Sequence, residues 1–138
     1  MFERCLYFNT NHLFRLTEKK FANAYSELNL APAHAYLLRL VLQKPGIIQR
    51  DIALVLHLEK STVTRFIKKM SEEGYLTKDY VSAQNLKSPG IYPTPKTQKI
   101  ANRLNEIGDQ LYASLQDSID VNELSLLVES IKSASKKI

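Results

Sequence analysis

The chain contains little of what marks secreted, membrane-spanning or disulfide-stabilised proteins. Its 138 residues include one cysteine, Cys5, which has no second cysteine to pair with, so a reducing compartment is the default. No apolar run approaches the length that spans a bilayer, and the residues from Met1 to Arg4 begin no secretory signal. We therefore expect a cytoplasmic protein without a membrane partner.

Motifs of enzyme and metal chemistry are also missing. There is no glycine-rich phosphate loop and no nucleophile motif, and carboxylates are grouped only at Glu72 and Glu73, on a solvated helix end. The three histidines, His12, His34 and His57, fall in separate predicted helices without the paired spacing of metal ligands. We therefore predict no enzyme, no cofactor and no metal site.

What the chain does contain is a pair of amphipathic patterns between Gln49 and Met70. In the first pattern, Ile52, Ala53 and Leu56 form one apolar stripe, and the small Ala53 lets a second helix cross closely. In the second pattern the apolar positions repeat at helical spacing, and they are Val63, Phe66, Ile67 and Met70. This arrangement predicts a helix-turn-helix whose bend is made by His57 or its neighbours, where glycine is more usual.

The polar face of the second helix carries hydroxyls and cations, with no carboxylate before Glu72. Its residues are Ser61, Thr62, Arg65, Lys68 and Lys69. Short hydroxyls followed by long cations suit a helix that reaches base edges with its first turns and phosphates with its flanks. We therefore interpret it as a DNA recognition helix; the alternative is a structural helix pair with a solvated charged face.

The net charge of +5 is concentrated around this helix pair. The segment from Lys44 to Lys99 contains ten basic and five acidic residues, whereas the rest of the chain contains nine of each. A central segment with excess positive charge, between flanking segments of no net charge, is typical of a nucleic-acid-binding surface. In a generally basic protein the positive charge would be spread evenly along the chain.

A β-hairpin is predicted directly after the second helix. Gly74 is expected to cap that helix, and Tyr75–Val81 is rich in β-forming residues. After a polar loop, Ile91–Pro93 provides a short returning strand, with Pro93 at its edge or end. A hairpin in this position is a wing.

Long helical patterns flank this centre. One runs from about Phe2 to Leu28 without Gly or Pro, and another opens at Pro32 and ends near Gln43. After the hairpin, apolar residues from Ile100 to Ile119 repeat every three or four positions. Asp120-Val121-Asn122 separates them from a last helix, which precedes a polar tail at Lys132–Ile138.

Together these patterns predict a mainly α fold with a small β-hairpin wing. We expect a single domain over residues 1–138, in which residues 31–94 form a winged helix-turn-helix DNA-binding region. Residues 1–30 and 95–138 are expected to be long dimerisation helices, because a monomer would expose a large apolar surface on them.

The run Leu58-Glu59-Lys60-Ser61-Thr62-Val63-Thr64-Arg65 resembles the opening of the recognition helix in the MarR family of winged helix-turn-helix transcriptional regulators. The order of predicted elements also fits, and Ile91-Tyr92-Pro93-Thr94-Pro95-Lys96 resembles the family's step from wing into helix. The likeness covers nearly the whole chain. It departs at Thr97, where the family commonly has Gly, and at Asn85-Leu86-Lys87, where the wing usually bears Asp-x-Arg. Lysine lacks the planar fork of the arginine that enters the minor groove.

The resemblance implies a homodimeric transcriptional regulator, a repressor, on a pseudo-palindromic operator in double-stranded DNA, with recognition helices ~34–36 Å apart. Base or nearby phosphate contacts are implied for Ser61, Thr62 and Arg65; Arg65 either pairs with a guanine or serves position alone. Phosphate contacts are implied for Gln49, Thr64, Lys68, Lys69 and Lys87. The alternative function is a winged-helix dimer that acts as a protein-interaction module without specific DNA binding.

Control by a small molecule is a further implication of the resemblance. Many relatives release DNA when a phenolic or other aromatic ligand enters a crevice, which here would be lined by Tyr25, His34, Tyr36 and Arg39; the alternative is that these are core or surface residues. A branch of the family senses hydroperoxides through a cysteine in the N-terminal helix. For Cys5 we favour the alternative of a small, buried, apolar residue over that redox role.

Overall fold

The computed structural model describes residues 1–80 and 88–138 of the chain. They form two compact units, Met1–Asn105 and Glu106–Ile138, and the boundary falls inside helix α5, which spans Pro95–Ser118. The end of the predicted strand at Val81 and the predicted wing residues Asn85, Leu86 and Lys87 lie outside the described residues. In the described ranges, no helix combines the length and the apolar character needed to cross a membrane.

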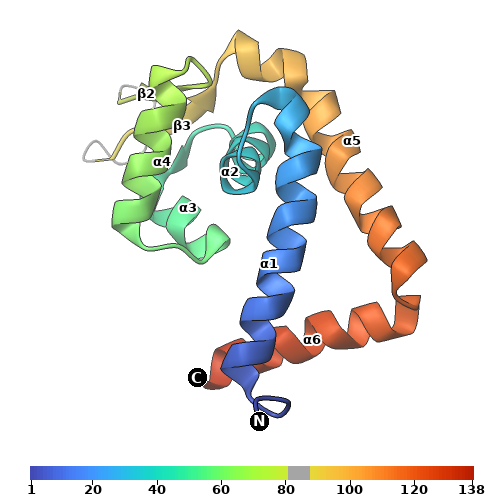
Figure 1. Ribbon diagram of the computed structural model, residues 1–138. Helices are drawn as coiled ribbons and strands as arrows, with labels where there is room; N and C mark the ends of the chain where they lie inside the picture. The colour runs from blue at the N-terminus through green and yellow to red at the C-terminus, as the bar shows by residue number, and fades with distance from the viewer. Residues whose placement is uncertain (81–87) are drawn as a thin grey trace. The chain divides into compact units, whose positions relative to one another are not determined.

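The first unit is mainly helical (Figure 1). Its elements before the sheet are α1 at Leu6–Tyr25, a 3-10 turn η1 at Ser26–Leu28, and α2 at Pro32–Gln43. α1 begins later than predicted because Cys5 is its N-cap, with Sγ accepting a hydrogen bond from the Phe8 N–H. α2 begins at a proline, as predicted, since the first turn of a helix does not use that N–H.

The predicted helix-turn-helix is confirmed. α3 spans Gln49–Leu56 and α4 spans Lys60–Glu72. His57 makes the bend in the left-handed conformation, with φ 55° and ψ 45°, and its N–H donates to the Ala53 carbonyl. Histidine is among the residues that tolerate this conformation better than most, so the turn forms without glycine.

The predicted wing belongs to a three-stranded antiparallel sheet. β2 at Leu76–Asp79 pairs with β3 at Gly90–Pro93, and β3 also pairs with β1 at Ile47–Ile48. The sequence pattern missed β1, because two residues are too short to show an alternating period. Gly46 enters β1 at φ 90°, and a Cβ there would stand 2.9 Å from the Tyr92 hydroxyl, so glycine is needed for both conformation and space.

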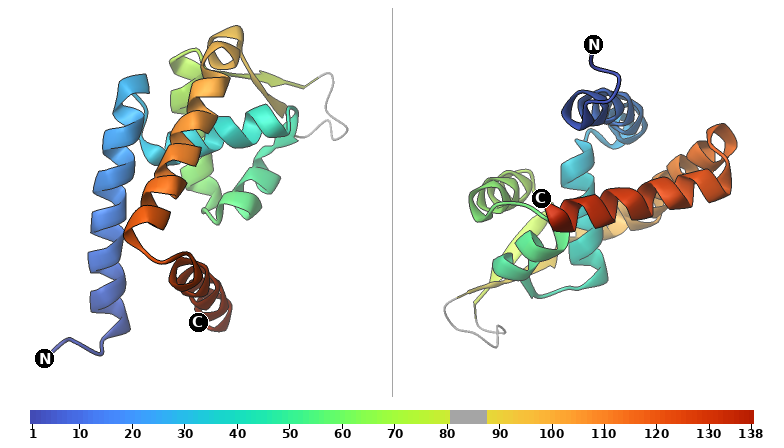
Figure 2. Two further views of the ribbon diagram at one scale, coloured as in Figure 1. Left: turned by 90° about the vertical axis from the view of Figure 1, so that its right-hand side faces the viewer. Right: turned by 90° about the horizontal axis from the view of Figure 1, so that it is seen from below.

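The core of the first unit is built around α2, which contacts α1, α3, α4 and β3 (Figure 2). Its buried residues are Ala35, Leu37, Leu38, Leu40 and Val41. α3 adds Ile52 and Ala53, and α4 adds Val63, Ile67 and Met70, as the apolar patterns predicted. Burial of each large aliphatic side chain stabilises the fold by about 1.5–3 kcal/mol, so α4 is held to the rest of the unit by its apolar face.

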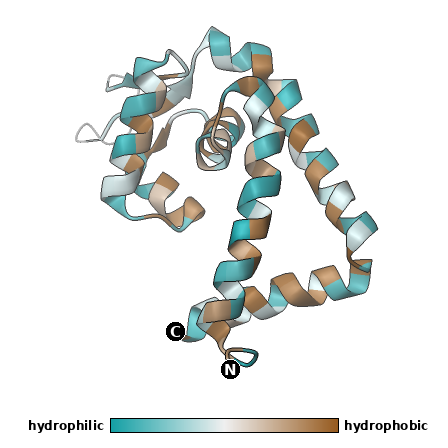
Figure 3. Cartoon of the chain, in the orientation of Figure 1, coloured by the Kyte–Doolittle hydropathy of each residue, from teal (hydrophilic) through white to brown (hydrophobic). Residues whose placement is uncertain are grey.

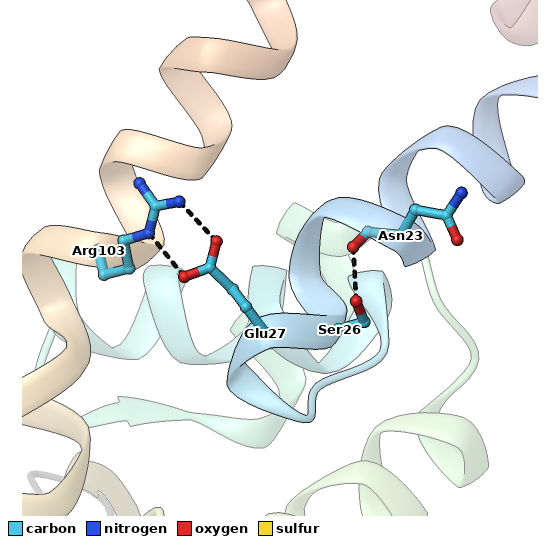
Figure 4. A network of polar contacts seen from close by, with 4 residues as sticks. All are labelled: Asn23, Ser26, Glu27 and Arg103. Carbon is cyan, nitrogen blue, oxygen red and sulfur yellow. Dashed lines mark hydrogen bonds and ion pairs between the residues drawn. The ribbon is translucent and has the colours of Figure 1, made fainter.

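An ion pair joins the first part of α5 to η1 (Figure 4). Arg103 donates from Nε and Nη2 to both carboxylate oxygens of Glu27, and this pairing lowers the pKa of Glu27 below its ordinary range. η1 is itself braced by the Ser26 hydroxyl, which donates to the Asn23 carbonyl at 2.6 Å. The turn that follows α1 is thereby fixed to the start of α5.

The second unit contains the end of α5, which spans Pro95–Ser118, and α6 at Val121–Lys137. The predicted break is confirmed: Asp120 caps α6, and its carboxylate accepts from the N–H groups of Asn122 and Glu123 at 3.1 and 3.3 Å. The predicted polar tail was wrong, because α6 continues through it to Lys137. Two lysines in the last turn favour the helix there by facing the negative end of its dipole.

Candidate nucleic-acid interface

α4, which Figure 1 labels, presents the polar face that the sequence predicts. Ser61, Arg65, Lys68 and Lys69 are exposed and Thr62 is half-buried, while the opposite side of the helix is in the core. Arg65 and Thr62 lie side by side, one turn apart, and Arg65 Nη2 donates to the Thr62 hydroxyl at 3.3 Å. The first two turns of α4 therefore expose the Arg65 guanidinium and the Ser61 hydroxyl, and the Thr62 hydroxyl accepts from that guanidinium.

A side-chain contact ties the start of α3 to the start of α4. The Gln49 amide donates to the Thr64 hydroxyl, and also to the Lys60 carbonyl at 3.3 Å. Thr64 in turn donates its hydroxyl hydrogen to the Lys60 carbonyl at 2.9 Å. Gln49 and Thr64 thus have partners inside the protein, and they fix the angle at which α4 leaves the turn. Their implied phosphate contacts stay a prediction.

The other end of α4 is held by the first turn of α5. Three successive carbonyls accept from it: Glu73 from Lys96 at 2.7 Å, Gly74 from Thr94 at 2.6 Å, and Tyr75 from Thr97 at 2.5 Å. Glu73 is the C-cap of α4, and the last carbonyls of a helix have no intrahelical partner, so the Lys96 donor stabilises the helix end. Gly74 and Tyr75 follow in the connection to β2, so the other two bonds hold that connection. Thr97, the departure from the family's Gly, is fully buried and uses its hydroxyl here. We call this set of contacts the α5 clamp.

The α5 clamp was not predicted from the sequence. Gly74 was expected as the cap, and it does take φ 83°. Thr94 directly precedes α5 and its carbonyl accepts from the Gln98 N–H, while its hydroxyl donates to the Gly74 carbonyl outside α5. The contacts join residues more than twenty positions apart. The pattern Thr94-Pro95-Lys96-Thr97 signals a helix start, and nothing in it indicates which carbonyls its side chains reach.

Three of the four predicted crevice residues come together on α1 and α2. Tyr25 is fully buried and its ring meets Tyr36 edge-on at 6.4 Å, and the guanidinium of Arg39 lies 5.9 Å from the centre of the Tyr36 ring. Burial, and next the neighbouring Tyr25, raise the pKa of Tyr36 above its ordinary value. Arg39 also donates to the Asn105 amide oxygen at 3.3 Å.

A pocket of about 590 Å³ in the first unit is lined by Tyr36 and Arg39, together with Leu40, Leu42, Gln43, Val55, Leu56, Gln98, Ala101 and Asn105. Tyr25 does not line it; this residue contacts the Tyr36 ring, and its buried hydroxyl has no hydrogen-bond partner in the described part of the chain. The pocket therefore combines apolar walls with one guanidinium and several amides.

The fourth predicted crevice residue, His34, lies elsewhere. Its ring meets the Phe66 ring edge-on at 4.7 Å, so it contacts α4 from α2. Burial and the nearby Lys69 lower the pKa of His34 below its ordinary value, and Glu73 opposes this shift. His34 is thus a packing residue behind the recognition helix.

Cys5 is exposed, so the predicted burial of this residue was wrong. Its position as the N-cap of α1 explains the difference, because the thiol is turned back along the chain toward the first turn of the helix. Among the described residues, no three His, Cys, Asp or Glu side chains gather in a way that could hold a metal ion.

The sequence and the fold are both similar to known proteins. Residues 30–79 match the sequence model of the MarR family. The uncharacterised HTH-type transcriptional regulator YybA of Bacillus subtilis (strain 168) is 33% identical over 76 residues, which are 55% of this chain and 49% of that protein. The chain therefore aligns with about half the length of this curated relative.

Three solved structures show the same fold. The MepR–DNA complex of S. aureus has a TM-score of 0.83 at 14% identity, covering 98% of both chains. A putative MarR family regulator from Listeria monocytogenes, complexed with 26mer DNA, has a TM-score of 0.80 at 21% identity and covers 98% of this chain and 89% of that one. The transcriptional regulator SlyA has a TM-score of 0.80 at 22% identity, covering 96% and 93%. These structures confirm the predicted winged helix-turn-helix fold.

Proposed function

We propose that this chain is a transcriptional regulator of the MarR family, a repressor, that binds a pseudo-palindromic site in double-stranded DNA as a homodimer. α4 enters the major groove, where Arg65 and its hydroxyl neighbours meet base edges while Lys68 and Lys69 meet phosphates. Two of the solved relatives, from S. aureus and L. monocytogenes, are complexes with DNA.

The observation that carries this proposal is the rigid presentation of the α4 face. Its exposed positions before Glu72 are hydroxyls and cations, its opposite face is buried, and both of its ends are held by side chains of other helices. A helix fixed in this way loses little further freedom on binding, and an interaction surface gains affinity from such pre-organisation.

The homodimer is supported by the exposed apolar surface of α1. Its large exposed side chains are Leu6, Tyr7, Phe8, Leu13, Phe14 and Leu16. Figure 3 shows brown, hydrophobic bands on α1. These residues lie in the first half of α1, and a monomer in water seldom exposes so many large apolar side chains on one stretch of helix. A second copy of the chain is the partner that the two-fold operator requires.

An effector pocket is the second part of the proposal. A volume of about 590 Å³ suits a small molecule. Tyr36 offers an aromatic wall and Arg39 a cation beside it, so a phenol or a small aromatic acid is the class of ligand expected. Substitution of Arg39 by Leu should then remove ligand-induced release of DNA without removing DNA binding itself.

The alternative is a winged-helix interaction module, and one observation favours it. Leu54 and Val55 on α3 are 67% and 47% exposed beside the winged region, where a protein partner could cover them. The two functions differ in what they predict for DNA, because an interaction module has no sequence preference.

Selection from a random duplex library at two salt concentrations tests these proposals. If the chain is a regulator, the selection should yield a palindromic site that it binds far tighter than bulk DNA, and the affinity should fall steeply with salt concentration. Recovery of no preferred sequence would reject the regulator and favour the interaction module. Size measurement of the complex in the same experiment shows whether one or two copies of the chain occupy the site.

A further inference from the structure

The pocket of about 590 Å³ in the first unit is bounded by two helices that also hold the recognition helix. α3 contributes Val55 and Leu56 to its lining, and α5 contributes three residues that include Gln98 and Ala101. Leu56 is the last residue of α3 and directly precedes His57, which makes the bend into α4. A molecule in the pocket would therefore touch, at the same time, both helices to which α4 is tied.

On the α5 side, the link to the recognition helix runs through the backbone of Tyr75. The fully buried Thr97 donates its hydroxyl hydrogen to the Tyr75 carbonyl at 2.5 Å, and the Tyr75 N–H donates to the Met70 carbonyl of α4 at 2.8 Å. Thr97 and Ala101 are four residues apart in α5, so they lie on one face of that helix, one turn from each other. Two hydrogen bonds in series thus join the α5 side of the pocket to the last turns of α4.

On the α3 side, the link to α4 is shorter. The turn at His57 follows the pocket lining directly, and the Gln49 amide at the start of α3 donates to the Thr64 hydroxyl of α4. Protein interiors are close-packed and transmit strain, so a change in the separation of α3 and α5 alters the angle of α4 or breaks one of these contacts. The pocket is therefore placed where its filling acts on both ends of the recognition helix.

The Thr97 hydroxyl joins the two helices, but the Tyr75 carbonyl does not depend on it for a partner. That carbonyl also accepts from the Thr94 N–H at 3.1 Å. A valine in place of Thr97 would keep the branched shape and would leave no buried carbonyl without a donor. The bond from Thr97 can therefore be removed by itself, without opening a cavity or orphaning a backbone group.

We propose, on the basis of the proposed DNA-binding function, that Thr97 is a positioning residue that transmits occupancy of the pocket to α4. A small aromatic molecule that fills the pocket displaces the α5 side, and the bond from Thr97 to Tyr75 carries this displacement to the end of α4. The recognition helix then leaves the angle that fits DNA. A ligand shifts such an equilibrium only through its different affinities for the two arrangements, and couplings of this kind change affinity about 5–150-fold.

The test uses a side chain as the probe that fills the pocket. Ala101→Phe places an aromatic ring there, and it should weaken binding to the selected DNA site about 5–150-fold. The same change in a Thr97→Val background should alter affinity by a factor near one, because the hydroxyl bond is absent. A Thr97→Ser background keeps a hydroxyl and should restore the loss. Asn102→Phe is the matched control, because Asn102 is exposed on α5 and does not line the pocket, and affinity should not change.

Failure of the proposed function and failure of the role of Thr97 give different results. If the unchanged protein selects no DNA site, both fall. If it selects a site and Ala101→Phe binds that site as well as Asn102→Phe does, the pocket is not coupled to α4. An equal loss in the unchanged and Thr97→Val backgrounds rejects the role of Thr97 alone. Thermal unfolding shows whether each variant is folded, and Ala101→Met, with a flexible side chain, replaces Ala101→Phe if that variant unfolds.

Discussion

Lys96, in the first turn of α5, donates a hydrogen bond of 2.7 Å from Nζ to the carbonyl oxygen of Glu73, the C-cap of α4. The same ammonium lies 4.2 Å from the centre of the ring of Tyr75, two residues after that cap. A lysine in the basic centre of the chain therefore completes the end of the recognition helix, and its charge faces the negative end of the helix dipole. The end of α4 is coupled to the helix that leads out of the winged region.

Replacement of Lys96 by Met should lower stability and leave the salt dependence of DNA binding unchanged. Loss of the hydrogen bond at a solvent-exposed helix end is expected to cost about 0.5–1.5 kcal/mol of unfolding free energy. Methionine keeps the apolar stem over Tyr75, so packing is preserved. Urea unfolding measures the first effect, and a salt titration of DNA affinity measures the second. A slope that fell by about 0.9 would assign Lys96 to a phosphate instead.

The contact between Gln49 and Thr64 makes a second prediction, which a double-mutant cycle tests. Gln49→Ala and Thr64→Val should each destabilise the protein, and the double variant should lose less than their sum, because each single change already breaks the shared hydrogen bond. Coupling of about 0.5–1.5 kcal/mol is expected for one side-chain hydrogen bond. Measurement is by urea unfolding of all four proteins.

Additive losses, within about 0.5 kcal/mol, would contradict the role of Gln49 in orienting α4. Ser61→Ala serves as the control partner for Gln49→Ala, since Ser61 is exposed on α4 and is not among the hydrogen-bond partners that the described structure gives Gln49. That pair should show no coupling.

The Gln49–Thr64 and Lys96–Glu73 contacts, at the two ends of α4, could not be predicted from the sequence. The helices, the turn at His57 and the hairpin were predictable, because apolar period, proline at helix starts and β-forming runs are local signals. The partners of Lys96 and Gln49 were not, because lysine and glutamine on a basic surface look the same whether they reach a phosphate or a carbonyl. Cys5 shows the same limit: its residue type favours burial, while its place before the first helical turn makes it a cap.

His34 predicts a dependence of stability on pH. Its pKa is lowered in the folded protein, chiefly by burial and then by Lys69, with Glu73 acting in the opposite direction. The folded state therefore favours neutral His34, and this contribution is fully present above the ordinary pKa of 6.5 and is lost as the pH falls through that value toward the folded pKa. Lowering the pH from 7.5 to 5.5 should destabilise the protein through this residue.

Urea unfolding at the two pH values measures the effect, with His34→Gln as the variant that cannot titrate. The loss of stability between the two values should be smaller in His34→Gln than in the unchanged protein. His12→Gln is the matched control, because His12 is exposed on α1, and it should keep the full loss. An identical loss in all three proteins would show that His34 is not the group responsible.

The role of Arg65 is decided by how a substitution affects different DNA sequences. Arg65→Ala removes a guanidinium that projects from the exposed face of α4 and is steadied by the Thr62 hydroxyl at 3.3 Å. If Arg65 forms a bidentate contact with guanine, the variant should lose about 1–3 kcal/mol of discrimination at one base pair, and the other positions of the site should keep theirs. Affinities for the selected site and for its single-pair substitutions measure this.

An arginine that serves position alone gives the opposite pattern. Arg65→Ala would then weaken binding to all duplexes by a similar factor. It would also lower the slope of log affinity against log salt by the amount that one phosphate contact contributes, as expected for Lys69→Ala. Arg65→Lys sharpens the distinction, because lysine keeps the charge and lacks the planar fork. If Arg65→Lys keeps the affinity but loses discrimination between base pairs, Arg65 reads a base. If Arg65→Lys keeps both, Arg65 makes no bidentate contact with guanine.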